Sequence, residues 1–203
     1  MNKTKIQWTE MTWNPITGCT KISEGCLNCY AARMAKRLKA MGNSRYINEF
    51  QVTVHKDLLD VPLGMKKPRM IFVNSMSDLF HEDVSDEIIL KVFETMNKAY
   101  WHTFQVLTKR PERVLEMDQK GLLKWTSNIW MGTTIESNKY IERANILRNT
   151  EACIKFLSCE PLLGSLKDIC LEKIDWVIVG GESGPKSREM KKAWVMMLRH
   201  SLR

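Results

Sequence analysis

Short apolar runs recur along the whole chain, separated by polar or helix-like stretches. Each run is rich in β-branched and aromatic residues and is apolar on consecutive positions, which is typical of strands covered on both faces in a parallel sheet. The runs recur about every 27 residues, close to the roughly 31 residues per unit of an eightfold β/α barrel. The predicted strands span residues 12–17, 51–54, 70–74, 103–108, 129–134, 154–158 and 176–179.

Amphipathic segments between these runs predict helices over residues 27–41, 86–99, 111–117, 138–147 and 191–202. Strands that alternate with helices indicate an α/β fold. We expect a single domain over residues 1–203, built as a partial (β/α) TIM-like barrel of about seven parallel strands. An eighth strand would fall at or beyond the end of the chain. A doubly wound open sheet is the alternative.

Composition narrows the class of protein. Hydrophobic residues make up 44% and charged residues 27% of the 203 positions, which excludes a disordered chain. No apolar run is long enough to span a membrane, and the N-terminus has no apolar signal core, so we expect a cytoplasmic protein. The formal net charge of +8 permits an anionic partner such as nucleic acid but is equally typical of a solvated surface.

Polar residues follow nearly every predicted strand. Glu136, Glu160 and Glu182 each lie within three positions of a strand end. Parallel α/β proteins build their active sites at the carboxyl ends of their strands. Ordinary loop polarity would explain one such residue, but a set at several strand ends predicts a convergent pocket.

Three of the six cysteines form a close group. Cys19, Cys26 and Cys29 are separated by six and then two residues. Thiolates suit iron–sulfur clusters, and three of them leave one iron of a four-iron cluster open for reactivity. Two alternatives stay open: a zinc site completed by water or by His81, and unligated buried thiols. Cys153 and Cys170, farther along the chain, are taken as structural.

An aromatic residue, Tyr30, directly follows the third cysteine. A three-cysteine loop after the first strand with such an aromatic resembles the radical S-adenosylmethionine enzymes, although their usual spacing is three and then two residues. In that setting Tyr30 would line the adenine of the cofactor; a core position is the alternative.

Several longer motifs accompany the cysteine group. They are Trp8-Thr-Glu, Thr12-Trp-Asn-Pro, Ser23-Glu-Gly-Cys-Leu-Asn-Cys-Tyr-Ala31, Ser75-Met-Ser-Asp-Leu-Phe-His81, Leu107-Thr-Lys-Arg-Pro-Glu-Arg113, Gly132-Thr-Thr-Ile-Glu136, Ser158-Cys-Glu-Pro161 and Asp175-Trp-Val-Ile-Val-Gly-Gly-Glu-Ser-Gly-Pro185. Together they resemble the phage-associated family of unknown function named after phage gene products thirty-seven and sixty-eight. Members of that family continue past the position of Trp194 to a final strand, so we expect the last barrel unit to be missing here.

The resemblance implies a [4Fe-4S] cluster held by the three cysteines, with S-adenosylmethionine on its open iron. An external electron donor would reduce the cluster, and cleavage of the sulfonium would release a 5′-deoxyadenosyl radical. Ser75, Ser77 and Asp78 match the positions that receive the methionine amino group. For Asp78 the alternative is a local turn or helix-capping role.

The remaining candidates line the expected pocket. Lys109 would meet the cofactor carboxylate or a substrate phosphate, and Glu136 and Glu182 would contact ribose or substrate. Cys159 would donate a hydrogen atom to a substrate radical, and Glu160 beside it would complete the catalytic pair. Core packing is the plainer explanation for Cys159.

The substrate class is left open by the sequence. Nucleic acid or a nucleotide is one hypothesis, supported by a basic stripe; a protein or small molecule is another. The third is a non-catalytic module that binds zinc or a redox cluster and acts in regulation or nucleic-acid binding. The stripe comprises Arg33, Lys36, Arg37, Lys109, Arg110 and Arg113.

Overall fold

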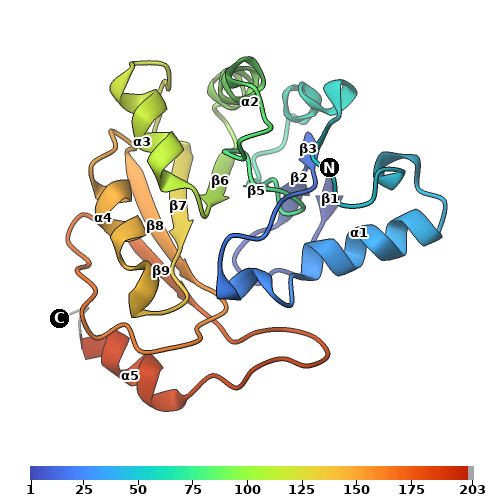
Figure 1. Cartoon of the computed structure of the whole chain (residues 1–203). Coiled ribbons are helices and arrows are strands. Elements are labelled where there is room, and N and C mark those ends of the chain that lie inside the picture. The colour runs from blue at the N-terminus through green and yellow to red at the C-terminus, as the bar shows by residue number, and fades with distance from the viewer. Residues whose placement is uncertain (201–203) are drawn as a thin grey trace.

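A parallel sheet forms the centre of the protein (Figure 1). The computed structural model describes residues 1–200. Six strands run parallel in the order β2, β5, β6, β7, β8, β9, and β1 pairs antiparallel with β2 at one edge. Helices alternate with these parallel strands along the chain, which confirms the α/β fold, and the sheet of the described residues does not close on itself. The strands are β1 (Asn2–Lys3), β2 (Met11–Trp13), β5 (Met70–Val73), β6 (Thr103–Thr108), β7 (Ile129–Thr134), β8 (Ile154–Cys159) and β9 (Trp176–Val179).

The parallel sheet has six strands where the sequence predicted about seven. The first predicted strand is interrupted at Pro15, which has no N–H to give to a ladder, so β2 ends at Trp13. Beyond the proline, β3 (Ile16–Thr17) pairs antiparallel with β4 (Thr53–Val54) in a separate two-stranded sheet. The predicted strand at 51–54 therefore belongs to this small sheet.

All five predicted helices are present. The helices are α1 (Tyr30–Ala40), α2 (Asp86–Lys98), α3 (Pro111–Gln119), α4 (Glu142–Arg148) and α5 (Lys192–His200). Helix α1 starts three residues later than expected because the backbone of Cys29, with φ −53° and ψ 121°, is not helical. Residues 24–26 form a separate 3₁₀ turn within the cysteine loop. The predicted end of the last helix at residue 202 lies outside the described residues.

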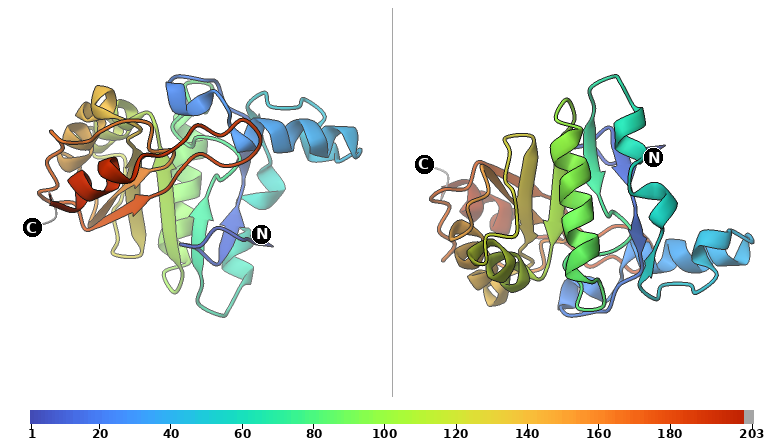
Figure 2. Two further views of the ribbon diagram at one scale, coloured as in Figure 1. Left: turned by 90° about the horizontal axis from the view of Figure 1, so that it is seen from below. Right: turned by 90° about the horizontal axis from the view of Figure 1, so that it is seen from above.

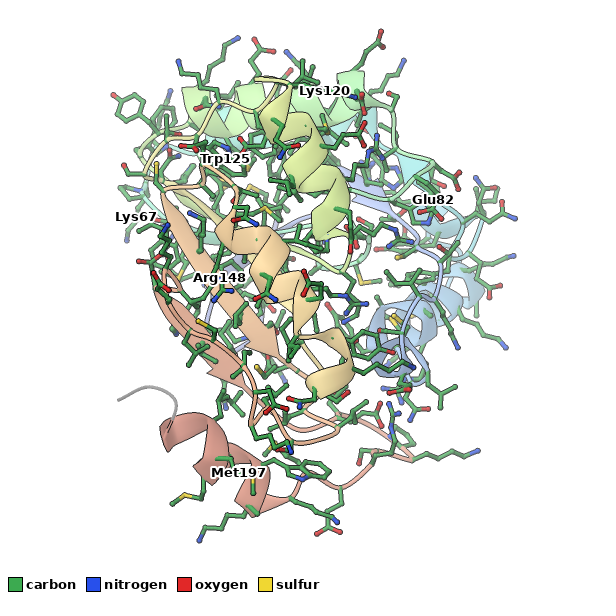
Figure 3. The ribbon with its side chains drawn as sticks, turned by 60° about the vertical axis from the view of Figure 1, so that its left-hand side comes forward. Lys67, Glu82, Lys120, Trp125, Arg148 and Met197 are labelled. Carbon is green, nitrogen blue, oxygen red and sulfur yellow. The ribbon has the colours of Figure 1, made fainter. Side chains whose placement is uncertain are left out.

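One face of the sheet packs against helices. Figures 1 and 2 show α2, α3 and α4 on the same side of the strands. Alternate strand residues such as Ile71, Phe104 and Met131 are fully buried in this apolar core. Trp125, labelled in Figure 3, packs edge-on against Phe93 of α2 at 5.3 Å between ring centroids. The alternation of apolar side chains thus fixes which face the helices cover.

The opposite face, which we call the aromatic face, carries the intervening side chains. Its members are Phe72, Trp130, Phe156 and Trp176, with Trp8 lying against them. The Trp8 ring lies 4.7 Å from that of Phe72 and 6.2 Å from that of Trp176. The chain before β2 therefore crosses this face and covers part of it. Within residues 1–200, no helix is long and apolar enough to cross a membrane.

Candidate functional site

A cavity of about 650 Å³ lies at the carboxyl ends of the parallel strands. Its wall includes all three clustered cysteines, Cys19, Cys26 and Cys29. Cavities of this size hold cofactor-sized ligands. The further sequence-predicted residues on its wall are Tyr30, Ser75, Ser77, Asp78, Lys109, Glu160 and Glu182.

The cysteine loop, residues 18–29, joins β3 to α1. Its start is fixed by backbone contacts, since Gly18 N–H donates to the carbonyl of Met76 at 2.9 Å and Cys19 N–H to that of Phe50 at 3.1 Å. Gly18 has a φ of +89°, and a Cβ there would lie 2.1 Å from the carbonyl oxygen of Gln51. Only glycine fits this position, which determines where Cys19 enters the cavity.

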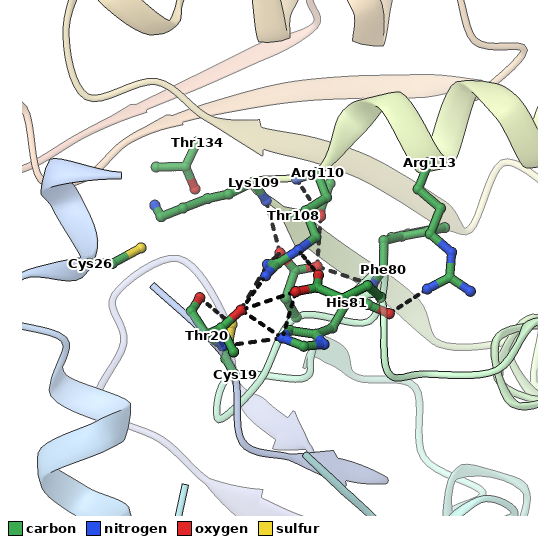
Figure 4. A network of polar contacts seen from close by, with 12 residues as sticks. Cys19, Thr20, Cys26, Phe80, His81, Thr108, Lys109, Arg110, Arg113 and Thr134 are labelled. Atoms are coloured by element: carbon green, nitrogen blue, oxygen red, sulfur yellow. Dashed lines mark hydrogen bonds and ion pairs between the residues drawn. The ribbon is translucent and has the colours of Figure 1, made fainter. Parts of the chain in front are cut away.

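Asp78 organises the strand ends beside Cys19. Its partners Thr108, Lys109 and Arg110 are labelled in Figure 4. One carboxylate oxygen accepts from the Thr108 hydroxyl at 2.6 Å and the Phe80 N–H at 3.0 Å. The other accepts from the Lys109 N–H and from the Arg110 guanidinium, both at 3.1 Å. This carboxylate is 6% exposed and fully engaged. The local turn role considered for Asp78 is therefore present, and it extends to a neighbouring strand.

Arg110 connects this carboxylate to Cys19. Its guanidinium reaches the Cys19 sulfur at 3.7 Å and forms an ion pair at 2.9 Å with the exposed Glu82, labelled in Figure 3. Burial, with the nearby charge of Asp78, raises the pKa of the Cys19 thiol to about 11, although Arg110 acts in the opposite direction. Without a metal ion, Cys19 is thus a protonated thiol at neutral pH.

His81, the candidate fourth zinc ligand, is fully buried behind Cys19. Its Nε2 lies 3.2 Å from the Thr20 amide nitrogen and 2.8 Å from the Thr20 hydroxyl, and its Nδ1 lies 3.1 Å from the Asp83 amide nitrogen. In the neutral ring one of the two nitrogens accepts and the other carries the proton. Both ring nitrogens are occupied. The ring therefore holds the loop in position, and a metal ion would have to displace these contacts to reach it.

Glu136 anchors the other end of the loop, near Cys26. Its carboxylate is fully buried and accepts from the Ser23 hydroxyl at 2.5 Å, Lys109 at 3.1 Å and Arg143 at 2.9 Å. Glu136 thus lies behind the cysteine loop and not on the cavity wall, where the sequence had placed it.

The environment of Cys26 differs from that of Cys19. Burial acts to raise the pKa of the Cys26 thiol, but hydrogen bonds from Ser23 and the loop backbone, together with the charge of Lys109, outweigh burial and lower it. In Figure 4, the side chain of Lys109 extends toward Cys26. The two thiols therefore differ in how readily they give a thiolate, which is the form that binds metals.

The segment after β9 forms a strap against the loop and α1. Glu182 accepts from Asn28 at 2.9 Å and pairs with Arg188. Arg33 of α1 donates to the carbonyl of Ser183 at 3.0 Å. The Arg188 hydrogen bond lowers the pKa of Glu182 to about 2. Figures 1 and 2 show this strap, residues 180–191, running beside the start of α1.

The loop after β5 and the start of α1 meet on the cavity wall. The Tyr30 hydroxyl donates to the carbonyl of Ser75. The Ser75 hydroxyl donates to the side chain of Asn14 at 3.2 Å, and that of Ser77 to the carbonyl of Ile16 at 2.9 Å. Each serine oxygen keeps acceptor capacity for a ligand.

Glu160 and Cys159 point to opposite sides of β8. Glu160 lines the cavity and accepts from the Trp8 indole N–H at 3.1 Å. Gly180 makes room for it, because a Cβ there would lie 2.4 Å from a Glu160 oxygen. Cys159 is buried in the helix-facing core, and burial raises its pKa to about 12. The structure thus does not bring Cys159 to the cavity.

Half of the basic stripe is neutralised by ion pairs with carboxylates. Lys109, Arg110 and Arg113 pair with the carboxylates of Glu136, Asp78 and Asp86, respectively. Within residues 1–200, the stripe cations without an ion pair are Arg33, Lys36 and Arg37, and the first of these bonds to backbone carbonyls. This leaves two exposed cations on α1, too few to define a nucleic-acid surface by charge alone.

Three site residues had no role in the sequence-based prediction. Asn74 lines the cavity, while Arg143 and Arg188 neutralise the two glutamates that hold the cysteine loop. Asn74 directly precedes Ser75 at the end of a predicted strand, so its position could have identified it as a candidate for the cavity wall. No sequence signal distinguishes either arginine from the other cations of the chain.

The comparisons with known proteins place the chain in a family without assigning it a reaction. Within residues 1–200, no three Cys, His, Asp or Glu side chains are arranged to hold a metal ion. No match was found among curated proteins or among solved structures. The family model of a protein of unknown function, DUF5131, matches residues 3–203, and the chain belongs to that family.

Proposed function

We propose that the protein is a radical S-adenosylmethionine enzyme that holds a [4Fe-4S] cluster on Cys19, Cys26 and Cys29. One observation carries the proposal: the three thiols line a single cavity at the carboxyl ends of parallel strands. The six parallel strands, with helices between them, support this proposal because the resemblance implies a partial barrel of parallel strands. The substrate we propose is a nucleotide or nucleic acid.

The donor set fits such a cluster. The described cavity wall offers three thiols and no further cysteine or histidine, and three thiolates suit a cluster with one open iron. Arg110 at 3.7 Å from the Cys19 sulfur and Lys109 near Cys26 would offset the negative charge of a thiolate-bound group. Because the three sulfurs do not yet converge, cluster binding would have to close the loop around the metal, with loss of the thiol protons.

The residues around the loop would then position and shield the site. When bound, the cluster and S-adenosylmethionine supply the one-electron chemistry that yields a 5′-deoxyadenosyl radical. Ser75 and Ser77 would accept from an ammonium of the ligand. Asp78 and Glu136 hold Arg110 and Lys109 beside the sulfurs, so their role is positioning.

Cleavage of S-adenosylmethionine tests the proposal. Protein purified and reconstituted under anaerobic conditions, given dithionite in place of the external electron donor, should produce 5′-deoxyadenosine. Cys26→Ala should abolish this product, whereas Cys153→Ala, which changes an exposed cysteine outside the cavity, should not. An intact cluster that gives no 5′-deoxyadenosine would refute the radical chemistry. A bound zinc ion without sulfide would instead favour a non-catalytic module.

A further inference from the structure

The unsatisfied polar groups of the protein gather on one face of the sheet. Within residues 1–200, three buried side-chain polar atoms have no hydrogen-bond partner: both amide atoms of Asn74 and the amide oxygen of Gln105. Buried polar groups are nearly always paired in folded proteins, so an orphaned amide needs an explanation. Asn74 directly follows β5 and Gln105 lies on the neighbouring β6, and of the two it is Asn74 that lines the cavity.

Asn74 directly follows β5, lies on the cavity wall and is 2% exposed. Its backbone is satisfied, since its N–H donates to the carbonyl of Trp13 at 2.8 Å and its carbonyl accepts from Ser77 N–H at 3.1 Å. Only the side chain lacks partners. An amide offers an adjacent donor and acceptor, so the missing partner is a group with the complementary pair.

Flat apolar surfaces lie next to this amide. Phe72, two positions before Asn74 on the same strand, also lines the cavity, and the Trp8 ring packs 4.7 Å from it. Gln105 pairs with Phe72 in the sheet register and donates to the carbonyl of Trp8 at 3.1 Å. Aromatic walls with one orphaned amide suit a planar heterocycle: the rings take its face and the amide its edge.

We propose that Asn74 reads the edge of a nucleobase in this cavity, with Trp8 and Phe72 as its stacking surface. Asparagine pairs its amide with the N6 and N7 atoms of adenine, where donor and acceptor are adjacent. Glu160 also lies on the wall, and its one side-chain hydrogen bond within residues 1–200 comes from Trp8, so it keeps acceptor capacity for a sugar hydroxyl. The inference rests on the cavity and holds whether or not the cysteines bind a cluster.

Asn74 has a φ of +58°. Asparagine tolerates this left-handed conformation better than most residues, so backbone geometry is the competing reason for its presence. Glycine also adopts the conformation and removes the amide. Asn74→Gly therefore separates the two explanations.

The test is adenosine binding by calorimetry to protein purified under anaerobic conditions. We expect saturable binding to the wild type and at least tenfold weaker binding to Asn74→Gly, with thermal stability nearly unchanged because no hydrogen bond within the protein is lost. Free methionine and ribose, which lack the base, should show no dependence on residue 74. The absence of adenosine binding to the wild type, or equal binding to both proteins, would overturn the proposal.

Asn74→Asp provides the second variant. Aspartate keeps the side-chain size and tolerates positive φ but cannot donate, so adenosine binding should again fall at least tenfold. Unchanged binding would contradict an edge contact.

Competition between adenosine and S-adenosylhomocysteine shows whether the nucleobase belongs to the cofactor or to a substrate. If S-adenosylhomocysteine displaces adenosine, the base belongs to the cofactor. If adenosine still binds in its presence, the base belongs to a substrate. The competition experiment follows once Asn74→Gly has been shown to lose adenosine binding. Neither outcome depends on the iron content of the protein.

Discussion

The two faces of the parallel sheet are completed in different ways. The face toward α2, α3 and α4 is closed by apolar packing, with Phe104, Val106 and Met131 fully buried. The aromatic face carries large rings as well, but it ends in a cavity and contains all the orphaned side-chain polar atoms of residues 1–200. The protein itself closes one face, and we propose that a ligand completes the other.

A buried ion pair supports the cysteine loop from behind. Glu136 and Arg143 form a buried ion pair that ties β7 to α4 and, through Ser23, to the cysteine loop. Such a pair does little for net stability but is costly to break. Through the Ser23 hydroxyl, the pair holds the cysteine loop in place.

Truncation of matched rings on the two faces should give the largest effect. Phe104→Ala removes a fully buried ring from the helix-facing core and should cost about 3–5 kcal/mol in free energy of unfolding. Phe72→Ala should cost at least about 1 kcal/mol less, because the space it leaves merges with the cavity. Urea denaturation measures both. Equal costs would mean that the aromatic face is as tightly closed as the helix-facing one.

Removal of the buried carboxylate should come next. Glu136→Ala leaves Arg143 buried without a counter-charge and should cost about 3 kcal/mol in free energy of unfolding. The double variant Glu136→Ala with Arg143→Met should recover part of that loss. Chemical denaturation of the three proteins measures the coupling, and strictly additive costs would show that the pair does not act as a unit.

A methyl group at Gly25 should disturb the loop and leave the core intact. A Cβ there would lie 2.5 Å from a Glu136 oxygen. Gly25→Ala should lower iron binding about tenfold or more, as is typical when support around a metal site is lost, and change the melting temperature little. Gly64→Ala, with nothing within 4 Å, is the matched control. Normal iron content in Gly25→Ala would show that the loop does not depend on this contact.

Acid should loosen the strap with a small effect on stability. Because Arg188 lowers the pKa of Glu182 to about 2, the carboxylate contributes stability above the unfolded value of 4.5 and loses it as the pH falls toward 2. Glu182→Gln should cost about 1 kcal/mol at neutral pH and remove that part of the acid dependence. Thermal melts from pH 6 to pH 3 measure it; parallel curves for both proteins would refute the assignment.

The sequence predicted much of the fold but less of the site. The apolar runs located all six parallel strands, because burial on both faces leaves a continuous apolar pattern. The amphipathic segments between them located all five helices. Pro15 could also have predicted the end of β2, because proline has no N–H to give to a ladder. Strand alternation could also have separated Cys159 from Glu160, since adjacent strand residues face opposite ways.

Contacts between distant residues account for what the sequence did not predict. The cysteine group was apparent from spacing, and the cavity from polar residues at strand ends. Nothing local pairs Glu136 with Arg143 or Asp78 with Arg110, because these partners depend on how neighbouring strands and helices align. The orphaned amide of Asn74 is a property of packing and is visible only in three dimensions.

Metal content measures the central claim most directly. Iron, acid-labile sulfide and zinc should be quantified in the wild-type protein, in Cys26→Ala and in Cys153→Ala after anaerobic reconstitution. The account predicts about four iron and four sulfide per chain in the wild type and in Cys153→Ala, and a loss of both in Cys26→Ala. One equivalent of zinc without sulfide, or iron retained by Cys26→Ala at the wild-type level, would contradict it.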